Sequence, residues 1–356
     1  MLYNGLTENY HTVSGKAGKI MSHRITRRNL IAGSVAGVAG FVGLEEKILL
    51  AALEKNADAN DEKSRQPRSN EAKIPTGKIG NLTFSRLILG GNLIGGWAHA
   101  RDLIYVSKLF QAYNTKEKIY ETLQLSEKYG VNTILMSDSQ LDIINNYKKD
   151  TGGKIQAIVN VTPQEENPIA GIDKAVDKGA ETIYLHGAAC DRCVKNQRID
   201  VIEKAIDYIK KKGLPAGVGC HSVYVLQQCR DAKIEPDYWV KTFHHDKYWS
   251  AHPPDKREPF TVDSKQSNNH NEIHDNMFCL EPQETIDFFK SEQKPWIAFK
   301  TLAAGAIPPA NGFQYAFENG ADFITVGMFD FQIAEDSAVV CKVLDKTKQR
   351  QRPWLA

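Results

Sequence analysis

Strong charge of either sign is missing from this sequence. Its 45 Lys and Arg residues are balanced by 43 Asp and Glu residues, which leaves a formal net charge of +2 over 356 residues. Such a balance creates no global field that would attract a polyanion, and no long basic run interleaved with aromatic residues is present. We therefore expect no nucleic-acid partner.

Cysteine is also scarce, with six residues in the whole chain. This number does not indicate a fold that is held together by a disulfide framework. Cys190 and Cys193 form a CxxC pair, which can be a redox pair or half of a zinc site, but no second CxxC is present to complete a four-thiolate site. We interpret the two as loop cysteines, bridged or unbridged.

The sequence has no apolar run long enough for a stable membrane span, which needs roughly 20 residues. The longest apolar run, residues 30–44, is about 15 residues long, rich in glycine and directly preceded by Arg27 and Arg28. Twin arginines before a weakly hydrophobic run resemble a Tat signal. We therefore expect residues 1–59 to be an N-terminal extension with a Tat-type signal segment, and residues 60–73 to be a polar linker. The Tat translocation machinery would then export the protein to the periplasm or another extracytoplasmic compartment.

From residue 74 to residue 350, short apolar runs that favour strands alternate with amphipathic segments that favour helices. Nearly continuous apolar strands are typical of a parallel sheet that is buried on both faces. Eight strand–helix units predict a (β/α)8 TIM barrel. A doubly wound sheet is the main rival, but the glycines at residues 90–96 do not have the G-x-G-x-x-G spacing of its fingerprint. The expected strands are residues 86–90, 133–136, 155–161, 182–186, 216–220, 238–243, 296–301 and 323–327.

The opening of this domain carries a family resemblance. Residues 74–91 end in Ser-Arg-Leu-Ile-Leu-Gly-Gly, and together with segments at residues 128–135, 184–186, 302–305 and 327–336 they resemble the aldo/keto reductases. The resemblance implies a β-hairpin that caps the barrel floor before the first strand. It also implies a nicotinamide cofactor such as NADP, held in part by Gly305, Gly327 and Gln332.

The aldo/keto reductases work with a tetrad of Asp, Tyr, Lys and His, and most of it is missing here. Leu135 stands where the Asp is expected, no Tyr follows at the usual distance, and Asn160 stands where the Lys is expected. Only His186 matches. The resemblance therefore implies a divergent member of the family.

Histidines follow three neighbouring predicted strands. His186, His221 and His244 come at the ends of the fourth, fifth and sixth strands, where the chemistry of a TIM barrel gathers. Three imidazoles that converge could hold a divalent metal such as zinc, with water in the fourth position. The same residues could instead line a metal-free pocket for acid–base chemistry.

Two further residues complete the candidate site. Residues 244–279 form an unusually long loop after the sixth strand, and such loops are often functional. Asp275 in this loop is our candidate for a fourth ligand or general base. Lys300 ends the seventh strand and is a candidate for anion binding, proton donation or Schiff-base chemistry, with an ion pair to a nearby Asp as the structural alternative.

These observations support three hypotheses about function. The first is an exported barrel enzyme that acts on a small sugar, polyol or carbonyl compound, with His186, Lys300 and Asp275 as catalytic residues. The second is an NAD(P)-dependent oxidoreductase with a rebuilt proton donor. The third is a non-catalytic barrel that binds a small molecule.

Overall fold

The computed structural model describes residues 74–97, 103, 105–260, 278–347, 350 and 352–356. The chain divides into a unit over Met1–Asn70 and a unit over Glu71–Ala356, and the second contains all the described residues. The expected Tat-type segment with its twin arginines and the linker at residues 60–73 lie outside the described residues. In the part of the chain that is described, none of the helices combines the length and the apolar character needed to cross a membrane.

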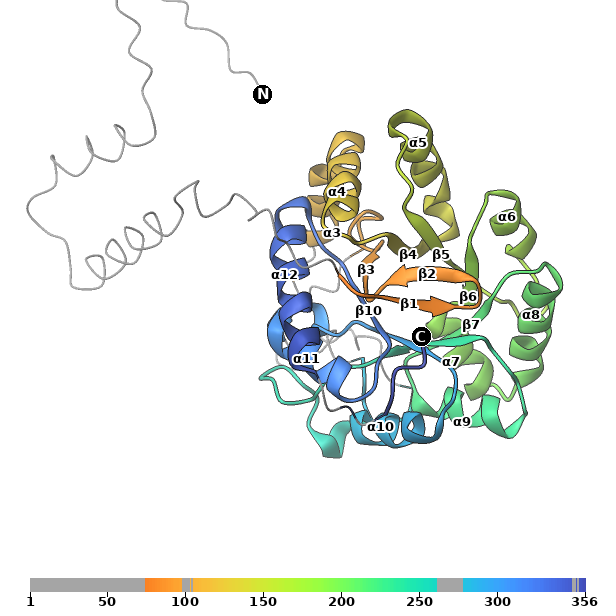
Figure 1. Ribbon diagram of the computed structural model, residues 1–356. Helices are drawn as coiled ribbons and strands as arrows, with labels where there is room; N and C mark the ends of the chain where they lie inside the picture. The colour runs from red at the N-terminus through yellow and green to blue at the C-terminus, as the bar shows by residue number, and fades with distance from the viewer. Residues whose placement is uncertain (1–73, 98–102, 104, 261–277, 348–349, 351) are drawn as a thin grey trace, which may run out of the picture. The chain divides into compact units, whose positions relative to one another are not determined.

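Eight parallel strands close into a barrel in the order β10-β3-β4-β5-β6-β7-β8-β9 (Figure 1). The predicted (β/α)8 fold is confirmed, and each of the eight expected strand segments overlaps one strand of the barrel. Their apolar runs form strands because both faces are buried, one inside the barrel and one under the helices. The strands are β3 (Leu87–Gly90), β4 (Thr133–Ser137), β5 (Gln156–Val161), β6 (Thr182–Leu185), β7 (Ala216–Cys220), β8 (Tyr238–Thr242), β9 (Trp296–Phe299) and β10 (Phe323–Val326).

Helices surround the barrel and connect its strands. Several end on a glycine with a left-handed backbone that only glycine adopts at low cost, as expected: φ is +86° at Gly130, +81° at Gly179 and +102° at Gly320. The helices are α3 (Val106–Tyr113), α4 (Lys116–Lys128), α5 (Leu141–Thr151), α6 (Ile172–Asp177), α7 (Gly187–Lys195), α8 (Ile199–Lys211), α9 (Val223–Asp231), α10 (Pro282–Ser291), α11 (Pro309–Glu318) and α12 (Asp330–Lys346). Short 3-10 turns cover Asp138–Gln140, Pro254–Lys256 and Ala303–Gly305.

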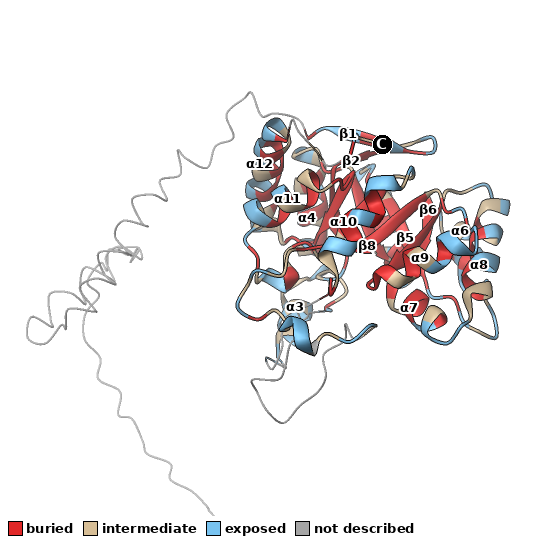
Figure 2. Ribbon diagram, turned by 90° about the horizontal axis from the view of Figure 1, so that it is seen from below, coloured by how far each residue is buried: buried red, intermediate tan, exposed pale blue. Residues whose placement is uncertain are grey.

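A β-hairpin covers the N-terminal end of the barrel, as the family resemblance implied. Strands β1 (Thr76–Ile79) and β2 (Leu82–Ser85) pair antiparallel around a tight turn that starts at Gly80, where φ is +60°. The hairpin closes the floor because Ile79 and Phe84 join the apolar cluster inside the barrel. Figure 2 shows the hairpin and the C-terminus at one end of the strands and α3 at the other.

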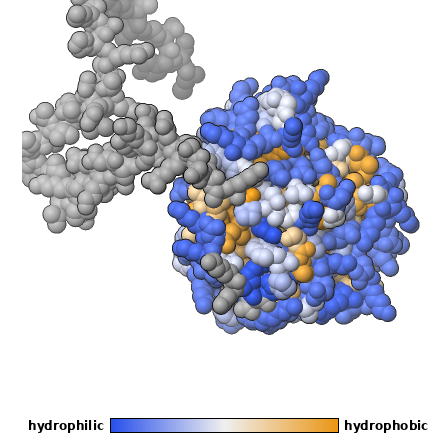
Figure 3. All heavy atoms as spheres, in the orientation of Figure 1, coloured by the Kyte–Doolittle hydropathy of each residue, from blue (hydrophilic) through white to orange (hydrophobic). Residues whose placement is uncertain are grey.

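The C-terminal tail packs on the same floor. The Arg86 guanidinium lies 3.7 Å from the Trp354 ring, and its Nη2 donates a 2.8 Å hydrogen bond to the carbonyl of Ala356. Arg352 forms a buried ion pair with Asp322 at 3.1 Å. Residues 352–356 therefore extend the barrel domain beyond the expected end at residue 350. The face of the molecule seen in Figure 3 is mainly hydrophilic, with hydrophobic residues in small groups.

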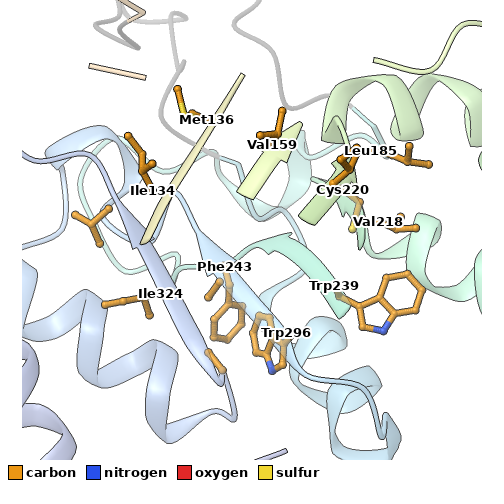
Figure 4. Close-up of a cluster of buried hydrophobic side chains, with 14 of the residues drawn as sticks. Ile134, Met136, Val159, Leu185, Val218, Cys220, Trp239, Phe243, Trp296 and Ile324 are labelled. Atoms are coloured by element: carbon orange, nitrogen blue, oxygen red, sulfur yellow. The ribbon is translucent and has the colours of Figure 1, made fainter. Parts of the chain in front are cut away.

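Two apolar clusters stabilise the barrel. The inner cluster contains Tyr184 and Tyr238, and β7 makes room for them with glycine: a Cβ on Gly217 would lie 2.5 Å from the Tyr238 ring. The outer cluster lies between the strands and the helices and includes the stacked rings of Phe289 and Trp296, 4.0 Å apart. Figure 4 shows part of this outer cluster around Trp296. The inner cluster does not extend to the C-terminal ends of the strands, where polar side chains follow.

Candidate active site

The C-terminal ends of the parallel strands form the mouth of the barrel. Side chains alternate between the inner and outer clusters along each strand, and this alternation places Asn160 of β5, His186 after β6 and His221 after β7 on the inward-facing set. These three strands are neighbours in the barrel. The mouth therefore has a polar arc on one side, at the end of the fold where TIM barrels carry out their chemistry.

A buried carboxylate orients His221. The Nδ1 atom of His221 lies 2.7 Å from Oδ2 of Asp191 on α7. The backbone N–H groups of His221 and Ser222 each donate a 3.1 Å hydrogen bond to Oδ1 of the same carboxylate. Because an ionised carboxylate can only accept, Nδ1 of His221 donates in this pair, which leaves Nε2 as the ring nitrogen that can exchange a proton.

Glycines bring strands β6 and β7 together at this point. A Cβ on Gly219 would lie 2.4 Å from the carbonyl oxygen of Leu185, which is far too close. A Cβ on Gly187 would meet Cε1 of the His221 ring at 3.3 Å. Glycine at both positions therefore lets the residues on either side of His186 pack directly against β7 and the His221 imidazole.

Lys300 directly follows strand β9 and lies at another side of the barrel mouth. Its backbone is left-handed, with φ at +56°, and Ala303 and Ala304 share this conformation. Strained backbone of this kind gathers at functional sites. The Lys300 Nζ lies 3.9 Å from the ring centre of Phe278 and 5.9 Å from that of Phe299.

The three basic side chains are close enough to affect one another. The His221 ring lies 5.8 Å from the same Phe299 ring. Burial lowers the pKa of His186, and the nearby His221 and Lys300 lower it further. His186 is therefore neutral at neutral pH. The structure brings together His186, His221, Asp191 and Lys300.

His244 does not join this group. Its Nε2 accepts hydrogen bonds from the backbone N–H groups of Phe278 and Cys279, at 3.0 and 3.1 Å, and its Nδ1 lies 2.8 Å from the carbonyl of His245. Both ring nitrogens are thus used to hold the chain after β8. Burial lowers the pKa of His244 to about 4, so the ring is neutral and suited to this role.

The three-histidine metal site is therefore not assembled as expected from His186, His221 and His244. Among the described residues, no three His, Cys, Asp or Glu side chains come together as a group that could hold a metal ion. The physical reason is the orientation of His244, whose ring faces the backbone of residues 278 and 279. Asp275, our candidate ligand or base, lies outside the described residues.

The long loop after β8 is described as far as residue 260. An ion pair between Arg257 and Asp246 at 2.9 Å ties its first part together. Trp249 within it is one of the most exposed aromatic side chains, with 78% of its surface accessible. The loop therefore adds an aromatic side chain on the mouth side of β8.

Leu135 and Asn160 stand where the family resemblance led us to expect an Asp and a Lys. Leu135 belongs to the inner apolar cluster. The Asn160 amide donates to the carbonyl of Met136 at 3.1 Å and lies 3.5 Å from the Tyr184 hydroxyl. Burial raises the pKa of Tyr184, so this phenol is a poor proton donor.

The residues expected to hold a nicotinamide cofactor lie around the turn from β10 to α12 and the turn after β9. Gly305 and Gly327 are exposed, but the Gln332 side chain already accepts the backbone N–H of Phe329 at 3.1 Å. The carboxylate of Asp330 occupies the first turn of α12, held by the Tyr113 hydroxyl at 2.6 Å and by Lys118 at 2.9 Å.

A dinucleotide phosphate at this helix end would meet the negative charge of Asp330. A helix N-terminus binds an anion through its unpaired N–H groups and its positive dipole end. Here one of these N–H groups is already paired, the first turn contains an acid and no base, and Lys118 is neutralised. The residues of this turn therefore do not fit a cofactor phosphate.

The cysteines differ from their expected environment. Cys190 and Cys193 lie on helix α7 and are buried, and no disulfide bond joins them. Burial raises the pKa of the Cys190 thiol, which makes it unreactive. The pair therefore packs α7 into the core, and the residue between them that faces the mouth is Asp191.

Asp191 is the one site residue that sequence reasoning missed. The CxxC spacing of Cys190 and Cys193 suggested thiol or zinc chemistry for this segment instead. The available signal was an acid five residues after a strand-end histidine, on the helix that must pack beside the next strand. With a second histidine at the end of that next strand, the spacing permits an Asp–His pair.

The comparisons with known proteins support the fold. No family model matches the sequence, and no curated protein matches it. A solved structure assigned as an aldo-keto reductase from Pseudomonas aeruginosa aligns with a TM-score of 0.50 at 15% identity, over 76% of this chain and 94% of that chain. A second structure assigned in the same way, from the same organism, aligns with a TM-score of 0.51 at 14% identity, over 76% of this chain and 98% of that chain. At this identity the likeness shows a shared barrel architecture.

Proposed function

We propose that this chain is an enzyme that moves a proton next to the carbonyl group of a small sugar or related hydroxy-carbonyl compound, as an isomerase does. The observation that carries the proposal is the 2.7 Å pair between His221 and Asp191 at the barrel mouth. An imidazole that is fixed by a carboxylate through one nitrogen is suited to acid–base work through the other.

The reaction needs a base, a stabiliser for negative charge and a way to return the proton. Nε2 of His221 takes the proton from the carbon next to the carbonyl, and the electrons of that C–H bond form an enediolate. The ammonium group of Lys300 stabilises the charge on the oxygen, with neutral His186 beside it. Neutral His186 donates a proton to the former carbonyl oxygen and accepts the hydroxyl proton from the neighbouring oxygen. The imidazolium of His221 then returns the first proton to the former carbonyl carbon, which gives the isomer without any external oxidant or reductant.

The two alternatives depend on different residues. Reduction by a nicotinamide cofactor would need a phosphate site at the β10–α12 turn, where Asp330 opposes an anion. A non-catalytic binding barrel would need no oriented imidazole. The buried carboxylate with three N–H partners therefore favours the acid–base enzyme over both.

The test uses the purified full-length chain in D2O. We expect deuterium incorporation next to the carbonyl of at least one of glyceraldehyde, erythrose and fructose, followed by 1H NMR. His221→Gln should abolish the exchange, whereas His245→Gln, a change of the same type outside the site, should retain it. NADPH oxidation with the same compounds is measured in parallel.

The outcomes separate the three hypotheses. Exchange that depends on His221 without NADPH consumption supports the proposal. NADPH consumption without exchange would replace it with the reductase, and neither activity in a folded protein that binds these sugars would replace it with the binding barrel.

We also propose that the protein is exported through the Tat machinery. The support is the placement of Arg27 and Arg28 directly before the apolar run at residues 30–44. Changing both arginines to lysine should leave the protein in the cytoplasm, as measured by fractionation and immunoblotting. Unchanged export of the double variant would contradict the proposal.

A further inference from the structure

Large hydrophobic side chains are exposed at one end of the barrel. Within the described part of the chain, each exposed large hydrophobic residue lies either between the C-terminal end of a strand and the next helix or near the start of that helix. This is the face that carries His221. The exposed large hydrophobic residues are Trp97, Leu103, Tyr105, Leu109, Ile169, Trp249 and Phe331.

Six of these seven residues form an arc, which we call the aromatic arc. They follow strands β8, β10 and β3, which lie on one side of the barrel around β9. His186 and His221 follow β6 and β7 on the other side, and Lys300 follows β9 inside the arc. A ligand across the mouth would therefore meet aromatic rings on one side and the acid–base groups on the other.

Helix α3 is held in the arc by aromatic contacts. Its Phe110 and Tyr113 rings pack edge-on against Phe329, at 5.1 and 5.4 Å. The Tyr113 hydroxyl also donates to Asp330 on α12. Tyr105, just before the helix, and Leu109 are four residues apart and exposed, so they are neighbours on the surface of this segment.

We propose that the aromatic arc binds a sugar ring that is linked to the reacting sugar, so that the substrate is a disaccharide or longer glycoside. This inference rests on the proposed acid–base function of His221. Trp97 and Trp249 have 49% and 78% of their surface exposed. Phe331 has 68% exposed, and one face of its ring stacks on Phe329 at 5.4 Å. Such rings offer flat faces against which the C–H face of a pyranose packs, while its hydroxyl groups remain in water.

Substrates of different lengths distinguish the role of the aromatic arc from the role of the reacting centre. On this proposal, a three-carbon sugar bound at His221 leaves the arc empty, whereas a disaccharide occupies both. Removing an aromatic ring from the arc should therefore weaken binding of the long substrate and leave the short one unaffected. Removing the imidazole of His221 should stop the reaction of both.

The experiment compares Trp97→Ala and Trp249→Ala with Ile169→Ala as the matched control. Ile169 is exposed on the same face but outside the aromatic arc. Binding of cellobiose, maltose and lactose to the full-length chain is measured by calorimetry, and isomerisation of the disaccharides and of glyceraldehyde by NMR. We expect KM and Kd for at least one disaccharide to rise roughly 10-fold in both Trp variants, with kcat unchanged.

Each outcome decides the inference. Unchanged disaccharide binding in the Trp variants, or no binding of any of the three by the parent protein, would overturn it. Equal losses on glyceraldehyde and on disaccharides would also overturn it, because the rings would then support the whole site. Calorimetric binding without any isomerisation would keep the aromatic arc as a glycan site and reject only the proposed reaction.

Discussion

Nδ1 of His221 lies 2.7 Å from Oδ2 of Asp191, and Oδ1 of that carboxylate accepts the backbone N–H of the same histidine. One carboxylate thus fixes both the ring and the main chain of His221. A histidine at a strand end would otherwise rotate about two side-chain bonds. The pair therefore predefines the direction in which Nε2 faces the mouth, which is the property that acid–base catalysis needs.

The first prediction concerns Asp191→Asn. An amide in this position can donate to Nδ1 and so favours the wrong tautomer of His221. We expect kcat for proton exchange to fall by roughly 10²- to 10⁴-fold while the chain stays folded. Asp200→Asn, which removes an exposed carboxylate on α8 that pairs with Arg198, should leave kcat unchanged. Full activity of the Asp191 variant would show that the pair is only structural.

The fold could be predicted from the sequence because its signals are local. A strand buried on both faces is a short apolar run, and a helix that ends before a strand leaves a glycine such as Gly130 or Gly179. These patterns do not depend on any distant contact. Eight of them in order are enough to define the barrel.

The site could be predicted only in part, because ring orientation depends on distant contacts. His186 and His221 were found from their places at strand ends. The direction of the His244 ring is set by backbone amides more than thirty residues away, at Phe278 and Cys279. The partner of His221 is on a helix from the preceding unit, and no pattern of spacing alone identifies it.

A second prediction concerns Lys300→Met. Burial, His221 and Lys300 all lower the pKa of His186, so loss of the ammonium charge should raise this pKa. The shift is measured by NMR titration of 13C-labelled histidine, with the signal assigned through His186→Asn. Lys290→Met removes an exposed lysine that pairs with Asp287 on α10 and should not move the signal. An unchanged pKa in the Lys300 variant would place the ammonium group away from His186.

A third prediction concerns His244 as a structural residue. His244→Ala would leave the N–H groups of Phe278 and Cys279 without their acceptor, which should lower the free energy of unfolding by about 2–4 kcal/mol. The pKa of His244 is lowered to about 4 in the folded state, mainly by burial. The stability that a neutral His244 contributes is therefore present above pH about 6.5 and is lost as the pH falls toward 4.

Urea unfolding at pH 7.5 and at pH 4.5 measures both effects. The deficit of His244→Ala should be larger at pH 7.5, because at pH 4.5 the wild-type protein has already lost part of this contribution. His245→Ala, at the neighbouring half-buried position, should cost less at both values. Equal stability of the His244 variant and the wild type at pH 7.5 would contradict the anchoring role.

The last prediction concerns Asp336, which is buried on α12. Its Oδ2 has no hydrogen-bond partner within the described structure, and burial together with Glu335 raises its pKa to about 6. An acid with a raised pKa contributes stability below its unfolded pKa near 4, and this stability is lost as the pH rises through about 6. At pH 8 the ionised group should cost up to about 3 kcal/mol, at roughly 1.4 kcal/mol per pKa unit.

Asp336→Asn keeps the shape and removes the charge. We expect this variant to match the wild type at pH 4 and to be more stable by about 1–3 kcal/mol at pH 8, measured by urea unfolding. Glu335→Gln removes only the exposed neighbouring charge and should give a smaller gain. The difference in stability between the wild type and Asp336→Asn could instead stay the same at pH 4 and pH 8. That result would show that the carboxylate is solvated as it is in the unfolded chain. The burial of this group would then not be the cause of any pH dependence in the barrel.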